Sequence, residues 1–313
     1  MLNRRFLRIK VFQSLYGFAQ EEKPLAHLYK RAMLNNLEKT YELYLFTLSF
    51  PLELKFFVEQ ELEVQKSKYF PLDNLIKPLE ALRNNKVIEL MEQNVQFQEA
   101  IKKVKPRWID SLDFSKKIFN EIKPLAFFQE YIAKGSPTFN EDKAFLTTLF
   151  EQLFSDSEQY ESYMEEAFVN WEDDQVLVLT SLQKMFNQLK EAKPEFLIDA
   201  HKDEDEDLKF MKDLFDFTIE HQAMFNELIN SKTQNWDQDR IALVDILLMR
   251  MALCEIMFFP FVPVKVSINE YLELAKLYST PNSHGFINGV LDKIQMQLKK
   301  DNKINKMGRG LME

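Results

Sequence analysis

Apolar residues recur every three or four positions along nearly the whole chain, which is the spacing of amphipathic α-helices. The pattern is clearest in residues 37–48, 75–101 and 210–229. Pro78 falls inside such a stretch and should kink or begin a helix. Other prolines should mark helix boundaries: Pro24, Pro51, Pro71, Pro106, Pro124, Pro137, Pro194, Pro260, Pro263 and Pro281. No alternation of strands with helices is visible, so the pattern predicts an all-α fold.

Part of the chain repeats after 65 residues. Residues 141–179 align without a gap to residues 206–244 and match at eight of 39 positions, where chance gives about two or three. Each copy carries Asn-Trp-x-x-Asp before an apolar run, at Asn170 and Asn235, as suits a helix N-terminus. This predicts a duplicated helical unit. The acidic segment 199–207 between the copies is interpreted as a solvated linker rather than a metal site.

Composition argues against most enzyme classes. Six glycines and one cysteine, Cys254, leave no phosphate-binding glycine loop and no intramolecular disulfide. The four histidines form no metal-binding pattern, and Cys254 lies in an apolar helical run that favours a core thiol. We predict that the protein is not an enzyme and uses no cofactor or metal. Neither a signal peptide nor an apolar run of about 18 residues is visible, which predicts a cytoplasmic protein.

The net charge of −9 is unevenly distributed. Residues 1–20 carry four bases and no acid, and residues 293–313 carry six bases and two acids, so each end is +4 and the remainder −17. If the two ends meet, they form a local basic patch on an acidic protein, which favours an anionic partner such as nucleic acid. Solvated ends without a partner are the alternative.

The first helix places Arg4, Arg5 and Arg8 on the side of its apolar residues. Guanidinium groups do not lie unpaired in a core, so these side chains should meet an anion. A phosphate of a bound nucleic acid would serve. A carboxylate patch of the protein itself is the alternative.

The segment SHGFINGVLDK near the C-terminus holds two of the six glycines inside a helical pattern, although each interior glycine costs about 1 kcal/mol relative to alanine. At 100° per residue, Gly285 and Gly289 fall on the polar face, beside Asn282, Phe286 and Lys293. That edge offers an amide, an aromatic ring and a cation to a stacked base and a phosphate. A close crossing with another helix of the chain is the alternative.

Just before this segment, Ser267 and Glu270 have the spacing of a capping box, with Val266 and Tyr271 as its hydrophobic staple. The pattern predicts a helix that begins at Ser267. Pro281 suits the first turn of the helix that follows.

The stretch KVSINEYLELAKLYSTPNSHGFINGVLDKI (265–294) strongly resembles the C-terminal signature of the bacterial transcription antitermination factor NusB family. RRFLRIKVFQSLY (4–16) resembles that family's arginine-rich first helix. NWDQDRIALVDILLMRMALCEI (235–256) is similar to its central helix, with Arg250 and Glu255 at characteristic places.

The resemblance covers residues 1–18 and roughly 206–300, and it implies a NusB-like helical bundle elaborated by an additional helical region. Four parts are expected. They are a first helix (1–20) that packs with the core, a helical insertion of unknown role (21–200), the NusB-like core (201–300) and a basic flexible tail (301–313).

The resemblance implies binding of single-stranded, boxA-type RNA together with NusE, a small-ribosomal-subunit protein. The pair would join the RNA polymerase antitermination complex and support processive transcription of ribosomal RNA operons. The expected RNA-binding residues are Arg4, Arg5, Arg8, Asn282, Ser283 and Phe286, with Gly289 and Lys293 added from the helical edge. Gly285 stands where the family often has a basic residue.

Two other functions fit the sequence. A NusB-like RNA-binding domain also precedes the catalytic domain of some RNA cytosine methyltransferases, but here 19 residues follow Ile294 without a glycine-rich cofactor loop. The protein could also be a protein-binding helical scaffold without specific RNA recognition.

Overall fold

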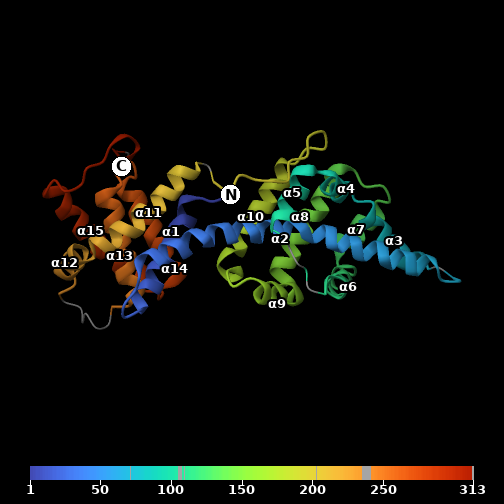
Figure 1. Cartoon of the computed structure of the whole chain (residues 1–313), viewed down its shortest axis with the longest axis horizontal. Helices are drawn as coiled ribbons and strands as arrows, with labels where there is room; N and C mark the ends of the chain where they lie inside the picture. The colour runs from blue at the N-terminus through green and yellow to red at the C-terminus, as the bar shows by residue number, and fades with distance from the viewer. Residues whose placement is uncertain (71, 105–107, 109, 202, 235–240, 312–313) are drawn as a thin grey trace. The chain divides into compact units, whose positions relative to one another are not determined.

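The computed structural model describes residues 1–70, 72–104, 108, 110–201, 203–234 and 241–311. Throughout these residues the regular structure is helical, and their one strand-like pairing is an isolated bridge between Lys190 and Lys193 (Figure 1). The predicted all-α fold is confirmed. In this part of the chain no helix is both long and apolar enough to cross a membrane.

The chain divides into two compact units, each described here by itself. Unit 1 consists of Met1 and Glu38–Ala200, and unit 2 consists of Leu2–Leu37 and His201–Glu313. Helix α2 (Ala26–Lys66) contributes residues to both. The other helices of unit 1 are α3 (Asp73–Arg83), α4 (Lys86–Gln93), α5 (Val95–Val104), α6 (Ser111–Ile122), α7 (Ala126–Ala133), α8 (Phe139–Asp156), α9 (Glu158–Ala167) and α10 (Trp171–Gln188). Those of unit 2 are α1 (Arg4–Gln20), α11 (Glu204–Glu220), α12 (Gln222–Lys232), α13 (Leu243–Phe258), α14 (Val264–Tyr278), α15 (Ser283–Lys300) and the short 3-10 helix η2 (Gly308–Leu311).

Asparagine side chains divide the helical stretch predicted over residues 75–101 into three helices. The Oδ1 of Asn85 accepts hydrogen bonds from the backbone N–H groups of Val87 and Ile88, at 3.0 and 3.1 Å. The Oδ1 of Asn94 accepts one from Phe97 at 2.8 Å. Such caps satisfy the first N–H groups of a helix, so α4 and α5 each begin within a continuous apolar pattern.

The expectation that Pro51 marks a helix boundary is wrong, because it lies inside α2. Leu48, Phe50 and Leu54 around it are fully buried, and this packing offsets the backbone hydrogen bond that proline removes. Pro78 likewise lies inside α3 rather than at its start.

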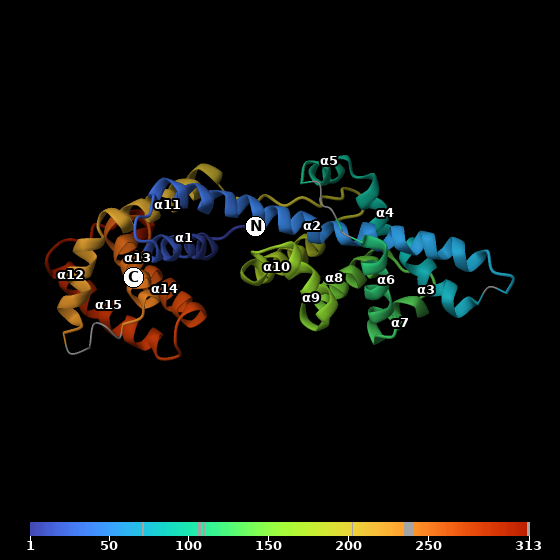
Figure 2. The same ribbon diagram turned by 60° about the horizontal axis from the view of Figure 1, so that its bottom comes forward.

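Three helices follow one another along the chain in each copy of the repeat: α8, α9 and α10 in unit 1, and α11, α12 and α13 in unit 2 (Figure 2). Helices α8 and α11 begin 65 residues apart, at Phe139 and Glu204, and α9 and α12 end 65 residues apart, at Ala167 and Lys232. The following aligned pairs are buried in both copies: Asp142 and Asp207, Phe145 and Phe210, Leu149 and Leu214, Phe150 and Phe215, Tyr160 and Phe225, Met164 and Ile229. The two segments therefore share helix order and buried positions, as the predicted duplication requires. Asn235, Trp236 and Asp239 of the second copy lie outside the described residues.

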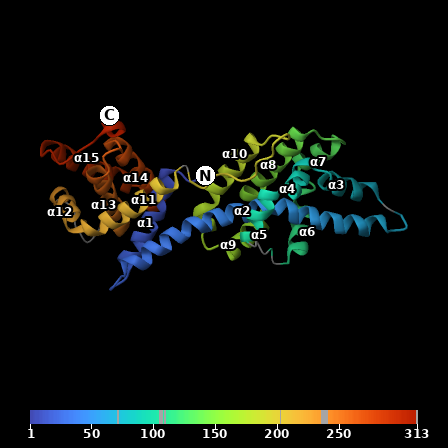
Figure 3. The ribbon, with the colours of Figure 1, turned by 45° about the horizontal axis from the view of Figure 1, so that its top comes forward.

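The core of unit 2 is built around α13, which contacts α1, α11, α12, α14 and α15 (Figure 3). Its residues from Leu247 to Ile256 are almost all buried. Cys254 is among them, and burial raises the pKa of its thiol to about 12, in keeping with the predicted core position. Because α1 and α14 both pack on α13, their side chains meet around Glu255.

Candidate nucleic-acid interface

Arg8 lies in the interior of unit 2 with only 3% of its side chain exposed, paired with the fully buried Glu255. Its Nε and Nη2 donate to the two carboxylate oxygens of Glu255 at 2.8 and 2.7 Å. Burial by itself lowers the pKa of Arg8, but the charge and hydrogen bonds of Glu255 outweigh it and raise that pKa. Arg8 therefore cannot reach a phosphate, which corrects its expected place among the RNA contacts.

Glu255 receives further hydrogen bonds from α14. The hydroxyl groups of Ser267 and Tyr271 donate to its carboxylate at 2.7 and 3.2 Å. The predicted capping box is wrong, because Pro263 is the N-cap of α14 and Ser267 lies one turn inside the helix. A Ser-x-x-Glu spacing is not unique to caps, and here the two residues bind charged groups of neighbouring helices instead.

Arg4 and Arg5 lie at the surface and also pair with carboxylates of unit 2. Arg4 donates from Nη2 to Glu206 at 2.6 Å, and its guanidinium lies 4.5 Å from the centre of the Phe210 ring. Arg5 donates from Nε and Nη2 to Glu270 at 2.8 and 2.9 Å, and these hydrogen bonds raise its pKa. Their side chains are 35% and 46% exposed. Exposed pairs are weak, so both cations remain accessible to another anion.

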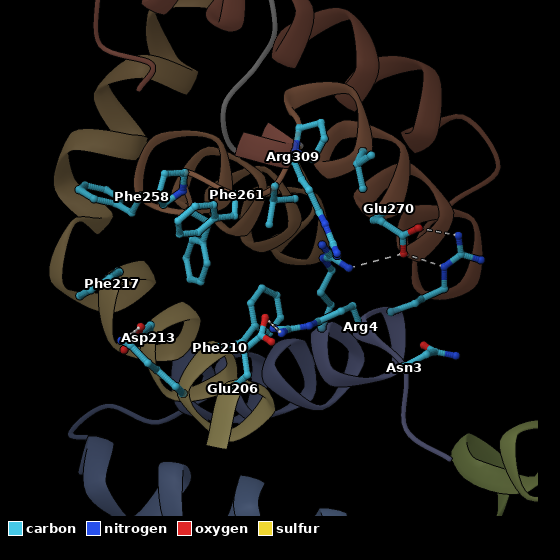
Figure 4. A pocket seen from close by; sticks show the side chains of 18 residues that line it. Asn3, Arg4, Glu206, Phe210, Asp213, Phe217, Phe258, Phe261, Glu270 and Arg309 are labelled. Atoms are coloured by element: carbon cyan, nitrogen blue, oxygen red, sulfur yellow. Dashed lines mark hydrogen bonds and ion pairs between the residues drawn. The ribbon is translucent and has the colours of Figure 1, made fainter. Parts of the chain in front are cut away.

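A groove of about 1170 Å³ lies beside these arginines, within unit 2. Its lining comes from the start of α1, from α11, from the turn between α13 and α14, and from Arg309 near the C-terminus (Figure 4). Five cationic side chains line it, but one of them is Arg8, whose charge is neutralised by Glu255. The other four cations face three carboxylates, a balance of +1 in a protein of net charge −9. The two basic ends of the chain thus meet at one groove.

The C-terminal segment is held beside this groove by backbone contacts. Met307 N–H donates to the carbonyl of Pro260 at 2.9 Å. Lys306 Nζ donates to the carbonyls of Glu255 and Phe259 at 3.2 and 2.9 Å, and burial lowers the pKa of this lysine to about 8. Gly310 is buried. These contacts fix Arg309 against the turn that follows α13.

Replacing Gly310 by alanine is expected to release this segment. A Cβ atom there would overlap the carbonyl oxygen of Pro260 and lie 3.0 Å from the carbonyl carbon, and backbone cannot move aside as a flexible side chain can. Hydrogen exchange should show loss of protection at the Met307 amide. Gly289→Ala, where a Cβ atom meets open space, is the matched control and should leave that amide protected. Unchanged protection in Gly310→Ala would contradict the close packing.

The second predicted surface lies on α15. The helical spacing that places Gly285 and Gly289 on the polar face of α15 leaves Ile287, Val290, Leu291, Ile294 and Leu298 on the other face, and these five residues are buried. On the polar face, Cβ atoms at Gly285 and Gly289 would meet no described atom within 4 Å. No helix in the described chain therefore crosses closely at these glycines. The bare backbone faces open space.

The other expected contacts on α15 differ in accessibility. Asn282 and Lys293 are exposed and Phe286 is half-buried. Ser283 is buried, and its hydroxyl is bonded to those of Ser279 and Thr280 at 3.0 and 2.8 Å. Ser283 is therefore occupied within the protein, which corrects its expected role.

The structure separates the predicted site residues into two surfaces of unit 2. Arg4 and Arg5 line the groove, whereas no residue of α15 does. Sequence reasoning missed Arg309 and the phenylalanines around the turn after α13. The signal was present in MFFPFVP (257–263), where aromatic residues flank a proline and follow no helical period.

The described residues form an all-helical fold with a local basic groove. Comparison with known proteins adds a family resemblance for part of the chain. Residues 174–296, from α10 to α15, match the NusB family. The resemblance to the NusB family thus lies in this part of the chain. The match does not include α1.

Curated relatives are named "Transcription antitermination protein NusB". The chain is 44% identical to that of Salinibacter ruber over 103 residues, which are 33% of this chain and 64% of the relative. It is 47% identical to that of Natranaerobius thermophilus over 75 residues, which are 24% of this chain and 54% of the relative. It is 44% identical to that of Chloroherpeton thalassium over 85 residues, which are 27% of this chain and 40% of the relative. The chain thus spans less than two thirds of the length of these relatives.

Proposed function

We propose that the protein acts in transcription antitermination by binding single-stranded, boxA-type RNA through unit 2, together with NusE. In this role it joins the RNA polymerase complex and supports transcription of ribosomal RNA operons. The observation that carries the proposal is the groove with a positive balance of charge, lined by Arg4 and Arg5, in a unit that bears most of the NusB-family match. The name of the relatives, transcription antitermination protein, supports the same process.

Within this proposal, Arg4 and Arg5 exchange their carboxylate partners for RNA phosphates. Such an exchange is feasible because Glu206 is 71% exposed and exposed ion pairs contribute only about 0–1 kcal/mol. The α15 edge forms the second contact, with Phe286 as a stacking surface, Asn282 and Lys293 as polar partners, and Gly289 giving access to the backbone.

Replacing both Arg4 and Arg5 by alanine should weaken binding to boxA-type RNA and reduce its salt dependence. Each lost phosphate contact lowers the slope of log affinity against log salt by about 0.7 for a single strand. Filter binding at several salt concentrations, with and without NusE, measures the RNA affinity and its salt dependence. The control is Lys116→Ala with Lys117→Ala, which removes two exposed cations from α6 of unit 1. An unchanged slope in the α1 variant would favour the protein-binding scaffold instead.

Gly289→Ala should separate binding from stability. Helix propensity predicts a gain of up to about 1 kcal/mol in the free energy of unfolding, since the new methyl group enters open space. If RNA approaches this face, affinity falls while the melting temperature holds or rises. The matched variant Asn288→Ala, at a half-buried neighbouring position, should not cause the same loss. Normal RNA affinity in Gly289→Ala would remove α15 from the interface.

A further inference from the structure

The groove has an aromatic side that the proposed phosphate contacts do not use. Phe217 of α11, Phe258 at the end of α13 and Phe261 in the following turn lie there, opposite Arg4, Glu270 and Arg309 (Figure 4). The ring centres of Phe217 and Phe258 are 5.6 Å apart. These three rings, from α11, α13 and the turn after it, give this side of the groove an aromatic lining.

Phe261 is the accessible member of this surface and is 66% exposed. The C-terminal segment holds its turn in place. Pro260 accepts the hydrogen bond from Met307, and Gly308 lies beside the ring, since a Cβ atom there would be 3.6 Å from Cδ1 of Phe261. An exposed aromatic ring on a turn held by the C-terminal segment can contact a flat partner.

The side of the groove opposite the rings carries a cation, Arg309. Arg309 is exposed and takes part in no ion pair in the described chain. An apolar peptide would cover the rings but leave this cation and the positive balance of the groove without a partner. A lone phosphate would bind the cations but leave the rings uncovered. A nucleotide satisfies both sides, because its base is planar and aromatic and its phosphate is anionic.

We propose that this groove holds one base of a single-stranded RNA, stacked on Phe261, with the adjoining phosphate on Arg309. The inference rests on the proposed function and adds to it a base-binding position formed by the turn after α13 and the C-terminal segment. The groove has a volume of about 1170 Å³. Small-molecule sites span about 300–1,000 Å³, so the groove is large enough for a nucleotide.

The test compares five variants of the full chain in fluorescence-anisotropy titrations with a boxA-type RNA. Phe261→Ala should weaken binding about tenfold without changing the salt slope, and Phe261→Tyr should retain affinity. Phe70→Ala, at a ring 78% exposed in unit 1, is the matched control and should have no effect. Arg309→Gln should lower the salt slope by about one contact, whereas Lys303→Gln, at a nearby exposed lysine, should not.

Photocrosslinking with RNA that carries 5-bromouridine at successive positions then locates the base. One position should crosslink to residues 258–261, and an abasic nucleotide there should weaken binding by as much as Phe261→Ala does. Combining the abasic nucleotide with Phe261→Ala should weaken RNA binding no further than either change alone.

Three outcomes would overturn the proposal. If the unmodified protein binds RNA but Phe261→Ala binds equally well, the base site is wrong and the proposed function stands. If the abasic and Phe261→Ala losses add in full, the ring does not contact that base. If the unmodified protein binds no RNA, the proposed function fails and the base site with it.

Discussion

Replacing Arg8 by alanine is expected to lower the free energy of unfolding of unit 2 by about 3–5 kcal/mol. The substitution removes the bidentate cation of the Glu255 carboxylate, which stays fully buried and keeps its hydrogen bonds from the Ser267 and Tyr271 hydroxyls. Removing one member of a buried ion pair costs more than the pair contributes, because the remaining charge stays desolvated. Urea denaturation followed by circular dichroism measures the change.

Arg5→Ala is the matched control, on the same helix and with an equivalent bidentate pair. Because Arg5 is 46% exposed, its loss should cost at most about 1 kcal/mol. Arg8→Met with Glu255→Met should recover part of the lost stability, since apolar replacement of a whole buried pair is often tolerated. Equal effects of Arg8→Ala and Arg5→Ala would show that the buried pair does not organise unit 2.

Phe150→Ala and Phe215→Ala are expected to destabilise their own units by about 3–5 kcal/mol each. The two residues are aligned by the 65-residue shift and are 1% and 0% exposed. Each alanine substitution removes a large ring from a buried core position, so the loss of buried apolar surface adds to the cost of the cavity. Thermal unfolding followed by calorimetry should show the change for each variant.

The exposed Phe70→Ala is the control for this pair and should change stability by no more than about 0.5 kcal/mol. If only one of the aligned phenylalanines behaves as a core residue, the two copies do not bury the same face. Similar large losses at both positions would support a shared helical unit in the two parts of the chain.

Hydrophobic spacing was sufficient to predict the helical fold and the buried face of α15, because both follow from local periodicity. It could not divide residues 75–101, where the helices end at asparagine caps rather than at a change of pattern. At Pro51 the sequence predicts a helix boundary, but α2 continues through it because the residues around it are tightly packed.

The arginines of α1 were recognised as anomalous, but their partners could not be read from the sequence. Arg8 and Glu255 are 247 residues apart, and Arg5 and Glu270 are 265 apart. Such pairs depend on tertiary contacts that no local spacing encodes. The same holds for the groove, because α1, the turn after α13 and Arg309 come together only in the folded unit.

The division of unit 2 into two sequence segments has a consequence for biosynthesis. Its first segment ends at Leu37, and the 163 residues from Glu38 to Ala200 must be translated before the second begins. At about 5–20 residues per second this takes roughly 8 to 33 s. During that interval Arg8 has no Glu255, and the apolar side of α1 has no α13 to cover it. Unit 1, nearly continuous in sequence, is translated before α13 and α14, so the partners of α1 in unit 2 become available only after unit 1 is complete.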